Sequence, residues 1–262
     1  MEAAHAALVR EVSPRLAHGE VTFLQRTPVD LERARSQHRA YVEVLRGHGL
    51  EIVQATPLPE HPDGVFVEDA VVVVDHLAVL TRPGAPSRRA EAASLQAVLE
   101  GYGLEVVALS SPATLDGGDV LQVGETILVG RTTRTNDVGI DQLGVLVAPL
   151  DRHVVPVDVD GALHLKTAAT ALPDGRILAN LDAVAAGAFG GRQVVAAEEP
   201  QGANALCIGG SVVLADSAPR TAAALRDEGY EVVTVDISEL EKVEAGPTCP
   251  SVLLPRRPRA GG

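Results

Sequence analysis

Apolar and polar positions follow one another along the chain in a repeated order of helix, glycine and short apolar strand. Three stretches share this order in similar wording: GHGLEIV from Gly47, GYGLEVV from Gly101 and DEGYEVVTV from Asp227. In each, a glycine stands where a helix ends in a left-handed residue, and the β-branched residues that follow are typical of a buried strand. Two weaker stretches, DRHVVPVDV from Asp151 and GRQVVAA from Gly191, extend the series to five copies.

Helix and strand signals around these exits define the repeated unit. We expect Asp30 to cap the helix before the first exit, Ser87 the helix before the second, and Ser217 with Pro219 to begin the helix before the last. Two strand-like stretches divided by a polar turn, such as VFVEDAVVVV and LAVLTR, stand ahead of a helix. Each unit therefore reads strand, strand, helix, strand, and five units predict a closed α/β ring with a polar site at its centre.

The composition of the chain limits which functions such a ring can have. The 262 residues are 46% hydrophobic, enough for a full core, and we expect one domain over residues 1–254 with a disordered tail at 255–262. The net charge of -13 argues against a nucleic-acid partner and is compatible with a small cationic substrate. The chain has neither a bilayer-spanning apolar run nor a signal peptide, so we expect a cytoplasmic protein without membrane contact, as a monomer or homodimer.

The two cysteines differ in their surroundings. Cys249 follows a Gly-Pro turn in KVEAGPTCPSVLL and opens an apolar strand, where a thiol can be exposed and a neighbouring His164 or a bound cation would lower its pKa. Cys207 lies inside the apolar stretch NALCIGGSVVL and is interpreted as buried filler. No CxxC, HExxH or Cys/His cluster is present, so we predict two free thiols and no metal site.

Three carboxylates precede the four valines of HPDGVFVEDAVVVV: Asp63, Glu68 and Asp69. Such a group repels itself unless a cation lies within it, and a planar guanidinium offers five donors that carboxylates can match in pairs. The alternative is a turn followed by a capped strand, and this segment alone leaves both open.

Two further segments carry groups suited to proton transfer. Asp116 and Asp119 flank two glycines in TLDGGDVLQVG, which is also ordinary turn chemistry. His164 interrupts an alternating strand in DGALHLKTAAT, with Lys166 next on the same face. A lone histidine of this kind is more often structural, but an orienting carboxylate such as Asp116 would favour a catalytic role.

Six segments in order resemble one family over nearly the whole chain: VFVEDAVVVV, LTRPGAPSRR, LDGGDV, GRTTRTN, LHLK and SELEKVEAGPTCPSVLL. They are similar to dimethylarginine dimethylaminohydrolase, a guanidino-group-modifying enzyme. The resemblance implies a five-bladed α/β propeller of pseudo-fivefold repeats, which agrees with the five copies counted above. It also implies that Cys249 is the nucleophile, His164 the general acid and base, Asp116 the carboxylate that orients His164, and that Asp69 and Glu68 hold the guanidinium.

The resemblance implies further substrate contacts. Asp63, Arg88 and Arg134 would bind the α-amino and α-carboxylate groups of an amino acid, and Leu16 corresponds to a leucine on the family's mobile lid. The backbone carbonyl of Val243 corresponds to another substrate contact. Without the resemblance, the two arginines read as ordinary solvated side chains.

The implied reaction is thiolate attack on the guanidinium carbon of an Nω-methylated arginine, release of dimethylamine or methylamine, and hydrolysis to L-citrulline without a cofactor. Two positions depart from the family pattern. Glu244 stands near the substrate where aspartate is expected, which bears on substrate preference, and Pro250 follows the nucleophile where some members carry a second cysteine.

Two other functions stay open at this point. A deiminase acting on arginine or agmatine would use the same residues, although arginine deiminases carry an additional helical insertion. A non-catalytic propeller that serves as a binding module would have no need of Cys249, His164 and Asp116 together.

Overall fold

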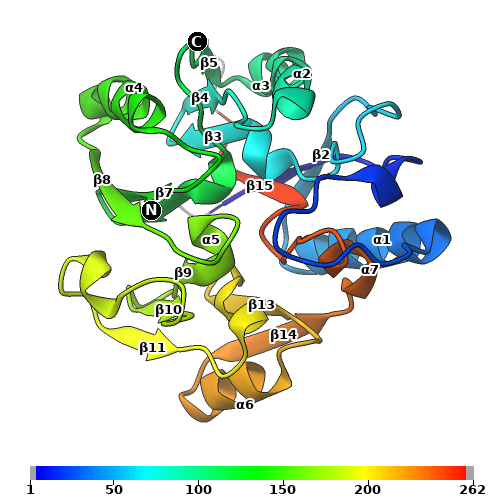
Figure 1. Cartoon of the computed structure of the whole chain (residues 1–262), viewed down its shortest axis with the longest axis vertical. Coiled ribbons are helices and arrows are strands. Elements are labelled where there is room, and N and C mark those ends of the chain that lie inside the picture. The colour runs from blue at the N-terminus through cyan, green and yellow to red at the C-terminus, as the bar shows by residue number, and fades with distance from the viewer. Residues whose placement is uncertain (1–3, 258–262) are drawn as a thin grey trace.

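The computed structural model describes residues 4–257, whose strands form five sheets arranged around a centre (Figure 1). The strands are β1 (Ala6–Val9), β2 (Glu51–Gln54), β3 (Val71–Val74), β4 (Leu77–Leu80), β5 (Glu105–Ala108), β6 (Val120–Val123), β7 (Thr126–Arg131), β8 (His153–Asp158), β9 (Ala169–Ala171), β10 (Ile177–Ala179), β11 (Val194–Ala196), β12 (Leu206–Ile208), β13 (Ser211–Ala215), β14 (Glu231–Val235) and β15 (Ser251–Leu254). The α-helices are α1 (Leu31–Gly47), α2 (Arg89–Ala93), α3 (Gln96–Tyr102), α4 (Asp137–Val147), α5 (Leu165–Ala168), α6 (Pro219–Asp227) and α7 (Ser238–Glu241).

All five sheets share one connectivity. Their strand orders are β15-β1-β2, β3-β4-β5, β6-β7-β8, β9-β10-β11 and β12-β13-β14. The middle strand is antiparallel to the first and parallel to the third, and the chain between the second and third strands forms the outer helix. The β9-β10-β11 unit replaces that helix with a 3-10 turn, Ala186–Phe189. The predicted unit and the predicted pseudo-fivefold α/β propeller are therefore confirmed.

Helix ends follow the predicted signals with one exception. Gly49, Gly103 and Gly229 have φ values of 81°, 99° and 92°, the left-handed region that glycine adopts without strain. The Asp30 carboxylate caps α1 by accepting the N–H of Arg33 at 3.0 Å. The cap predicted at Ser87 is wrong, because that hydroxyl donates to Glu20 Oε1 at 2.6 Å and the helix after it is split into α2 and α3.

Five apolar clusters fill the spaces between neighbouring sheets and so close the ring. One lies between the β15-β1-β2 and β12-β13-β14 sheets under α1, and the next lies between the β15-β1-β2 and β3-β4-β5 sheets under α3. The other three continue around the ring in the same way. The middle strands β4 and β13 are buried along their whole length, whereas third strands such as β2 and β5 are partly exposed.

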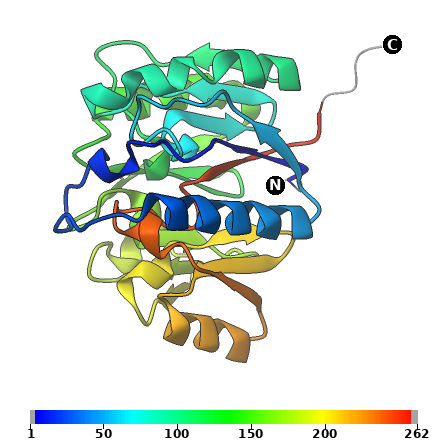
Figure 2. The same cartoon turned by 90° about the vertical axis from the view of Figure 1, so that its right-hand side faces the viewer.

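The segments that precede the first strands of the units meet near the centre. The turn before β3 contacts the turn before β6 and also β15, and α5 contacts the turn before β6. Seen from the side, the loop before α1 and helix α7 lie at the same edge of the molecule, away from the C-terminal end (Figure 2). This edge is where the candidate residues are found.

The C-terminal stretch is described as far as residue 257. Arg257 pairs with Glu51 at 2.8 Å and its guanidinium lies 4.7 Å from the ring centre of Tyr102, while residues 258–262 of the tail that we expected to be disordered lie outside the described residues. Within residues 4–257, no helix combines the length and the apolar character needed to cross a membrane.

Candidate active site

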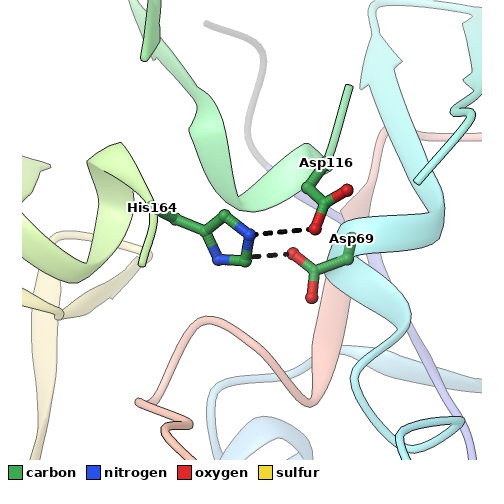
Figure 3. Close-up of side chains that lie close together, drawn as sticks. All are labelled: Asp69, Asp116 and His164. Carbon is green, nitrogen blue, oxygen red and sulfur yellow. Dashed lines mark hydrogen bonds and ion pairs between the residues drawn. The ribbon is translucent and has the colours of Figure 1, made fainter. Parts of the chain in front are cut away.

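His164 lies between two buried carboxylates (Figure 3). Its Nε2 is 3.0 Å from Asp116 Oδ2, and its Nδ1 is 3.8 Å from Asp69 Oδ1. Burial alone would lower the pKa of His164, but the carboxylates of Asp69, Asp116 and Asp119 outweigh burial and raise that pKa to about 9. The imidazole is therefore mostly protonated at neutral pH, and it has a carboxylate partner on each nitrogen.

The local structure at His164 differs from the prediction. We expected an alternating strand, but His164 is the residue that precedes helix α5. The reason lies far away in sequence: Asp119 Oδ1 accepts the N–H of Leu165 at 2.9 Å, which satisfies a free amide of the first helical turn.

Glycine makes the close approach of these groups feasible. A Cβ atom at Gly118 would lie 2.6 Å from His164 Nδ1 and 2.7 Å from Asp69 Oδ1. Asp116 is held in turn, because its Oδ1 accepts the N–H of Gly84 at 2.8 Å. Gly118 therefore belongs to the site, and Gly117 allows the close approach of the Glu68 backbone, whose carbonyl oxygen would lie 2.0 Å from a Cβ there.

Cys249 lies in the turn between α7 and β15, where its Sγ accepts the N–H of Gly246 at 3.4 Å. Burial raises the pKa of this thiol, and the carboxylates of Glu68 and Asp69 raise it further. In the free protein, burial and these two carboxylates oppose the thiolate that we expect beside His164. A cation placed against Asp69 would offset the part of this rise that comes from the Asp69 carboxylate.

Asp69, Asp116 and His164 offer ligand atoms within 4.8 Å of one another, which is close enough to bind one metal ion. Both oxygens of Asp116 already accept hydrogen bonds, and those of Asp69 accept the N–H of Gly118 at 3.1 Å and Arg88 Nη1 at 2.6 Å. Because the cationic Arg88 touches this group and the oxygens have donors, the arrangement fits a hydrogen-bonded network better than a metal site.

One cavity gathers most of the predicted residues from distant parts of the chain. Eight of them line it: Asp63, Asp69, Arg88, Arg134, His164, Val243, Glu244 and Cys249. Asp116 lies directly behind His164 and has no exposed surface. The cavity volume is about 20 Å³, room for one water-sized molecule. Entry of an amino acid therefore requires a neighbouring segment to move.

Arg88 has an environment that the sequence did not indicate. It is 5% exposed, and its guanidinium donates to Asp69 Oδ2, to Glu91 Oε2 and to the backbone carbonyls of Asp63 and Phe66. The carboxylate-binding role implied for Arg88 stays a prediction. In this geometry its contacts hold Asp69 in place instead.

Glu244 and Arg134, which line the cavity, bind the loop of residues 20–29, here called the covering loop, whose Glu20 also lines the cavity. The Glu244 carboxylate accepts the backbone N–H groups of Thr22 at 2.9 Å, of Phe23, and of Leu24 at 2.6 Å. Arg134 Nη2 donates to Thr22 Oγ1 at 3.1 Å. The glutamate that stands in place of the expected aspartate therefore bonds to the backbone of the covering loop.

Two predicted contacts lie elsewhere. Leu16 is fully buried in the core beneath α1 and is not among the residues that line the cavity, so the substrate contact implied for it has no support in this geometry. Glu68 faces a second cavity of about 190 Å³, where its Oε1 pairs with Lys166 at 2.5 Å and its Oε2 accepts the hydroxyl of Thr248 at 2.7 Å.

Sequence reasoning missed Glu20, Phe66, Leu163 and Ala245, which also line the cavity. Glu20 is placed by its own N–H, which donates to the Asp63 carboxylate at 3.1 and 3.2 Å. Leu163 and Ala245 are direct neighbours of the candidates His164 and Glu244, and Phe66 lies between the candidates Asp63 and Glu68, so proximity in sequence is a usable signal for all three. No local pattern marked Glu20.

The fold and the site together define the class of the protein. The family model for arginine deiminase matches residues 180–256. The N-terminal domain of ArgZ, a cyanobacterial arginine dihydrolase, shares the fold with a TM-score of 0.84 at 20% identity, over 97% of this chain and 99% of that domain. By its fold, the chain is a five-unit α/β propeller, and its cavity combines a cysteine, a histidine and carboxylates.

Relatives of higher identity define the family. N(G),N(G)-dimethylarginine dimethylaminohydrolase of Streptomyces coelicolor is 48% identical over 249 residues, which cover 95% of this chain and 96% of the relative. The enzyme of the same name from Pseudomonas aeruginosa is 32% identical over 85% of this chain and 89% of its own length. A cysteine-to-serine variant of the Pseudomonas enzyme, solved in complex with citrulline, superposes with a TM-score of 0.90 at 28% identity, over 96% of this chain and all of that one. The chain belongs to the dimethylarginine dimethylaminohydrolase family.

Proposed function

We propose that this chain hydrolyses Nω-methylated L-arginine to L-citrulline and dimethylamine or methylamine, with Cys249 as the nucleophile. One observation carries the proposal: a single buried cavity brings Cys249 together with His164 and Asp69, three residues from separate units of the propeller. A thiol, a protonated imidazole and a carboxylate are the groups needed to attack a guanidinium, protonate its leaving amine and hold its charge.

The substrate itself supplies the charge that activates the thiol. A guanidinium against Asp69 neutralises a carboxylate that raises the pKa of Cys249 and places a positive charge near sulfur, so the thiol loses its proton to solvent on binding. The thiolate then adds to the guanidinium carbon and forms a carbon–sulfur bond.

His164 serves as acid first and as base second. As the imidazolium that its raised pKa favours, it donates its proton to the departing nitrogen, the carbon–nitrogen bond breaks, and the amine leaves a thiouronium on Cys249. The neutral imidazole then removes a proton from water, hydroxide adds to the same carbon, and the carbon–sulfur bond breaks to release citrulline and the thiol. Asp116 holds the imidazole through the 3.0 Å bond to Nε2.

The test measures citrulline and identifies the released amine from asymmetric dimethylarginine, monomethylarginine, arginine and agmatine in parallel, with excess chelator present. Cys249→Ser removes the nucleophile, and Cys207→Ser is the matched control, because Cys207 lies on β12 outside the catalytic cavity. We expect dimethylamine or methylamine release that survives chelator and Cys207→Ser but is lost in Cys249→Ser. Absence of citrulline from both methylated substrates would contradict the proposal.

The second candidate is an arginine deiminase activity, favoured by the family model that matches residues 180–256. The same assay separates the two functions, because a deiminase releases ammonia from unmethylated arginine. The 48% identity with the Streptomyces dimethylaminohydrolase supports the methylarginine reaction over this candidate.

We further propose that residues 1–254 act as one catalytic domain in the cytoplasm. Support for one domain comes from the pairing of β15 with β1, which joins distant ends of the described chain in one sheet. Support for the cytoplasm comes from two free cysteines and a reaction that needs a reduced thiol. Cell fractionation followed by citrulline assay tests the location.

A further inference from the structure

The carboxylate of Asp119 is fully buried and accepts hydrogen bonds from two separate segments. Its Oδ1 accepts the N–H of Leu165 at 2.9 Å, at the start of α5. Its Oδ2 accepts the hydroxyls of Thr132 at 2.7 Å and Thr135 at 2.6 Å, in the loop after β7. Three donors on one buried carboxylate form a network in which every bond is costly to lose.

Each of these two segments carries a side chain that lines the catalytic cavity. His164 is the residue directly before Leu165, and Arg134 lies between the two threonines. Thr132 extends the network, because its Oγ1 accepts the N–H of Arg134 at 3.1 Å while it donates to Asp119. Asp119 thus connects the backbone at His164 with the backbone at Arg134 without touching the cavity.

The packing around Asp119 is built for a carboxylate at this point. A Cβ atom at Gly130 would lie 2.6 Å from Asp119 Oδ1 and 2.9 Å from the Cβ of Leu165, so a larger residue would displace the carboxylate. Burial raises the pKa of Asp119 to about 6, while His164 and the hydroxyl donors oppose this rise. The group is therefore mostly ionised at neutral pH and adds to the negative charge around the imidazole.

We propose that Asp119 is a positioning residue that fixes His164 and Arg134 relative to each other. Its bond to Leu165 fixes the position of the general acid and base, and its bonds to Thr132 and Thr135 fix the loop that presents Arg134. The kinetic part of this inference rests on the proposed function, whereas the titration of His164 does not.

The first experiment is Asp119→Asn, which keeps the shape and one acceptor but removes the charge. The pKa of His164 is followed by NMR of the imidazole carbons and assigned with His164→Gln. Groups facing the ring are the carboxylates of Asp69, Asp116 and Asp119. We expect the pKa of His164 to fall by about one unit, because one nearby opposite charge is lost, and kcat for dimethylarginine to fall about tenfold or more.

The second experiment tests the connection to Arg134. Thr132→Val removes the hydroxyl that joins Asp119 to Arg134, and we expect KM for dimethylarginine to rise about tenfold with kcat nearly unchanged. Thr132→Ser restores the hydroxyl and should recover most of the lost KM. If the network had only a structural role, Thr132→Val would lower kcat and raise KM together, and the variant would also be less stable.

Asp137→Asn is the matched control, because Asp137 begins α4 after the same loop and forms its ion pair with the exposed Arg131. It should leave the pKa of His164 and both kinetic constants unchanged, and unfolding midpoints verify that all variants fold. A His164 pKa in Asp119→Asn within about 0.3 units of the parent would overturn the inference, as would equal kinetic effects in Thr132→Val and Thr132→Ser. If the parent forms no citrulline, the proposed function fails while the titration still decides the role of Asp119.

Discussion

The contact between Glu244 and the covering loop makes a quantitative prediction. Its carboxylate accepts three successive N–H groups, those of Thr22, Phe23 and Leu24, and Glu244→Ala removes all three bonds at once. Hydrogen bonds to a charged group contribute roughly 1.5–3 kcal/mol each when buried, and exposure of these bonds reduces this to about 1 kcal/mol each. The loop should therefore lose about 3 kcal/mol of closing free energy, or about a hundredfold in the ratio of closed to open forms.

Limited proteolysis with chymotrypsin measures this ratio. Phe23 and Leu24 are 49% and 53% exposed and are cleavage sites only when the loop opens enough to enter a protease. Cleavage that is slow relative to reclosing follows the open population, so the rate should rise about a hundredfold in Glu244→Ala. Glu231→Ala, at the exposed start of β14, is the control and should leave the rate unchanged.

Steady-state kinetics provide the second measurement. The cavity of about 20 Å³ cannot hold an amino acid unless the loop moves, and binding is completed when the loop closes again. A less stable closed form should raise KM for dimethylarginine more than it lowers kcat. A cleavage rate within about threefold of the parent in Glu244→Ala would refute the reasoning, because the three bonds would then contribute nothing to closure.

Three further predictions concern the core of the site and the pH dependence of stability. The folded-state pKa of His164 is raised from 6.5 to about 9. The protonated imidazole should therefore stabilise the fold by about 3 kcal/mol below pH 6.5, and this stabilisation is lost as the pH rises through 9. Urea unfolding should show this loss in the parent and not in His164→Gln. Burial, aided by Arg39, lowers the pKa of His38 to about 4. The free energy of unfolding should therefore fall as the pH falls from 6.5 through 4, and in His38→Leu it should fall less over the same pH range. Gly118→Ala places a Cβ 2.6 Å from His164 Nδ1 and should reduce turnover about a hundredfold with little change in secondary structure by circular dichroism; turnover within threefold of the parent would contradict the packing described here.

The propeller could be predicted from the sequence because its signals are local. Glycine at three of the helix exits and the β-branched residues after it depend only on neighbours in the chain, and Gly49, Gly103 and Gly229 adopt the expected left-handed conformation. The helix cap at Asp30 has the same local origin, since its partner is three residues away.

The candidate site could be predicted only in part, because its details depend on partners distant in sequence. Cys249, His164 and Asp69 were found from motifs and do line one cavity. The prediction of a strand at His164 is wrong because the carboxylate that caps this helix start, Asp119, lies 46 positions before the Leu165 amide that it accepts. Likewise, no local pattern could show that the donors of Arg88 are turned inward onto buried acceptors, or that the leucine of the predicted lid is a core residue.

The pairing of β15 with β1 determines when the active site forms during folding. Ala6 pairs with Leu254, so this contact closes a loop that spans nearly all of the described chain, and long-range pairings of this kind form slowly. Cys249 stands two residues before β15 and receives its surroundings only when that strand docks. A refolding chain should therefore regain its circular dichroism before its thiol regains the reactivity of the native protein, and catalytic activity should return in the last kinetic phase.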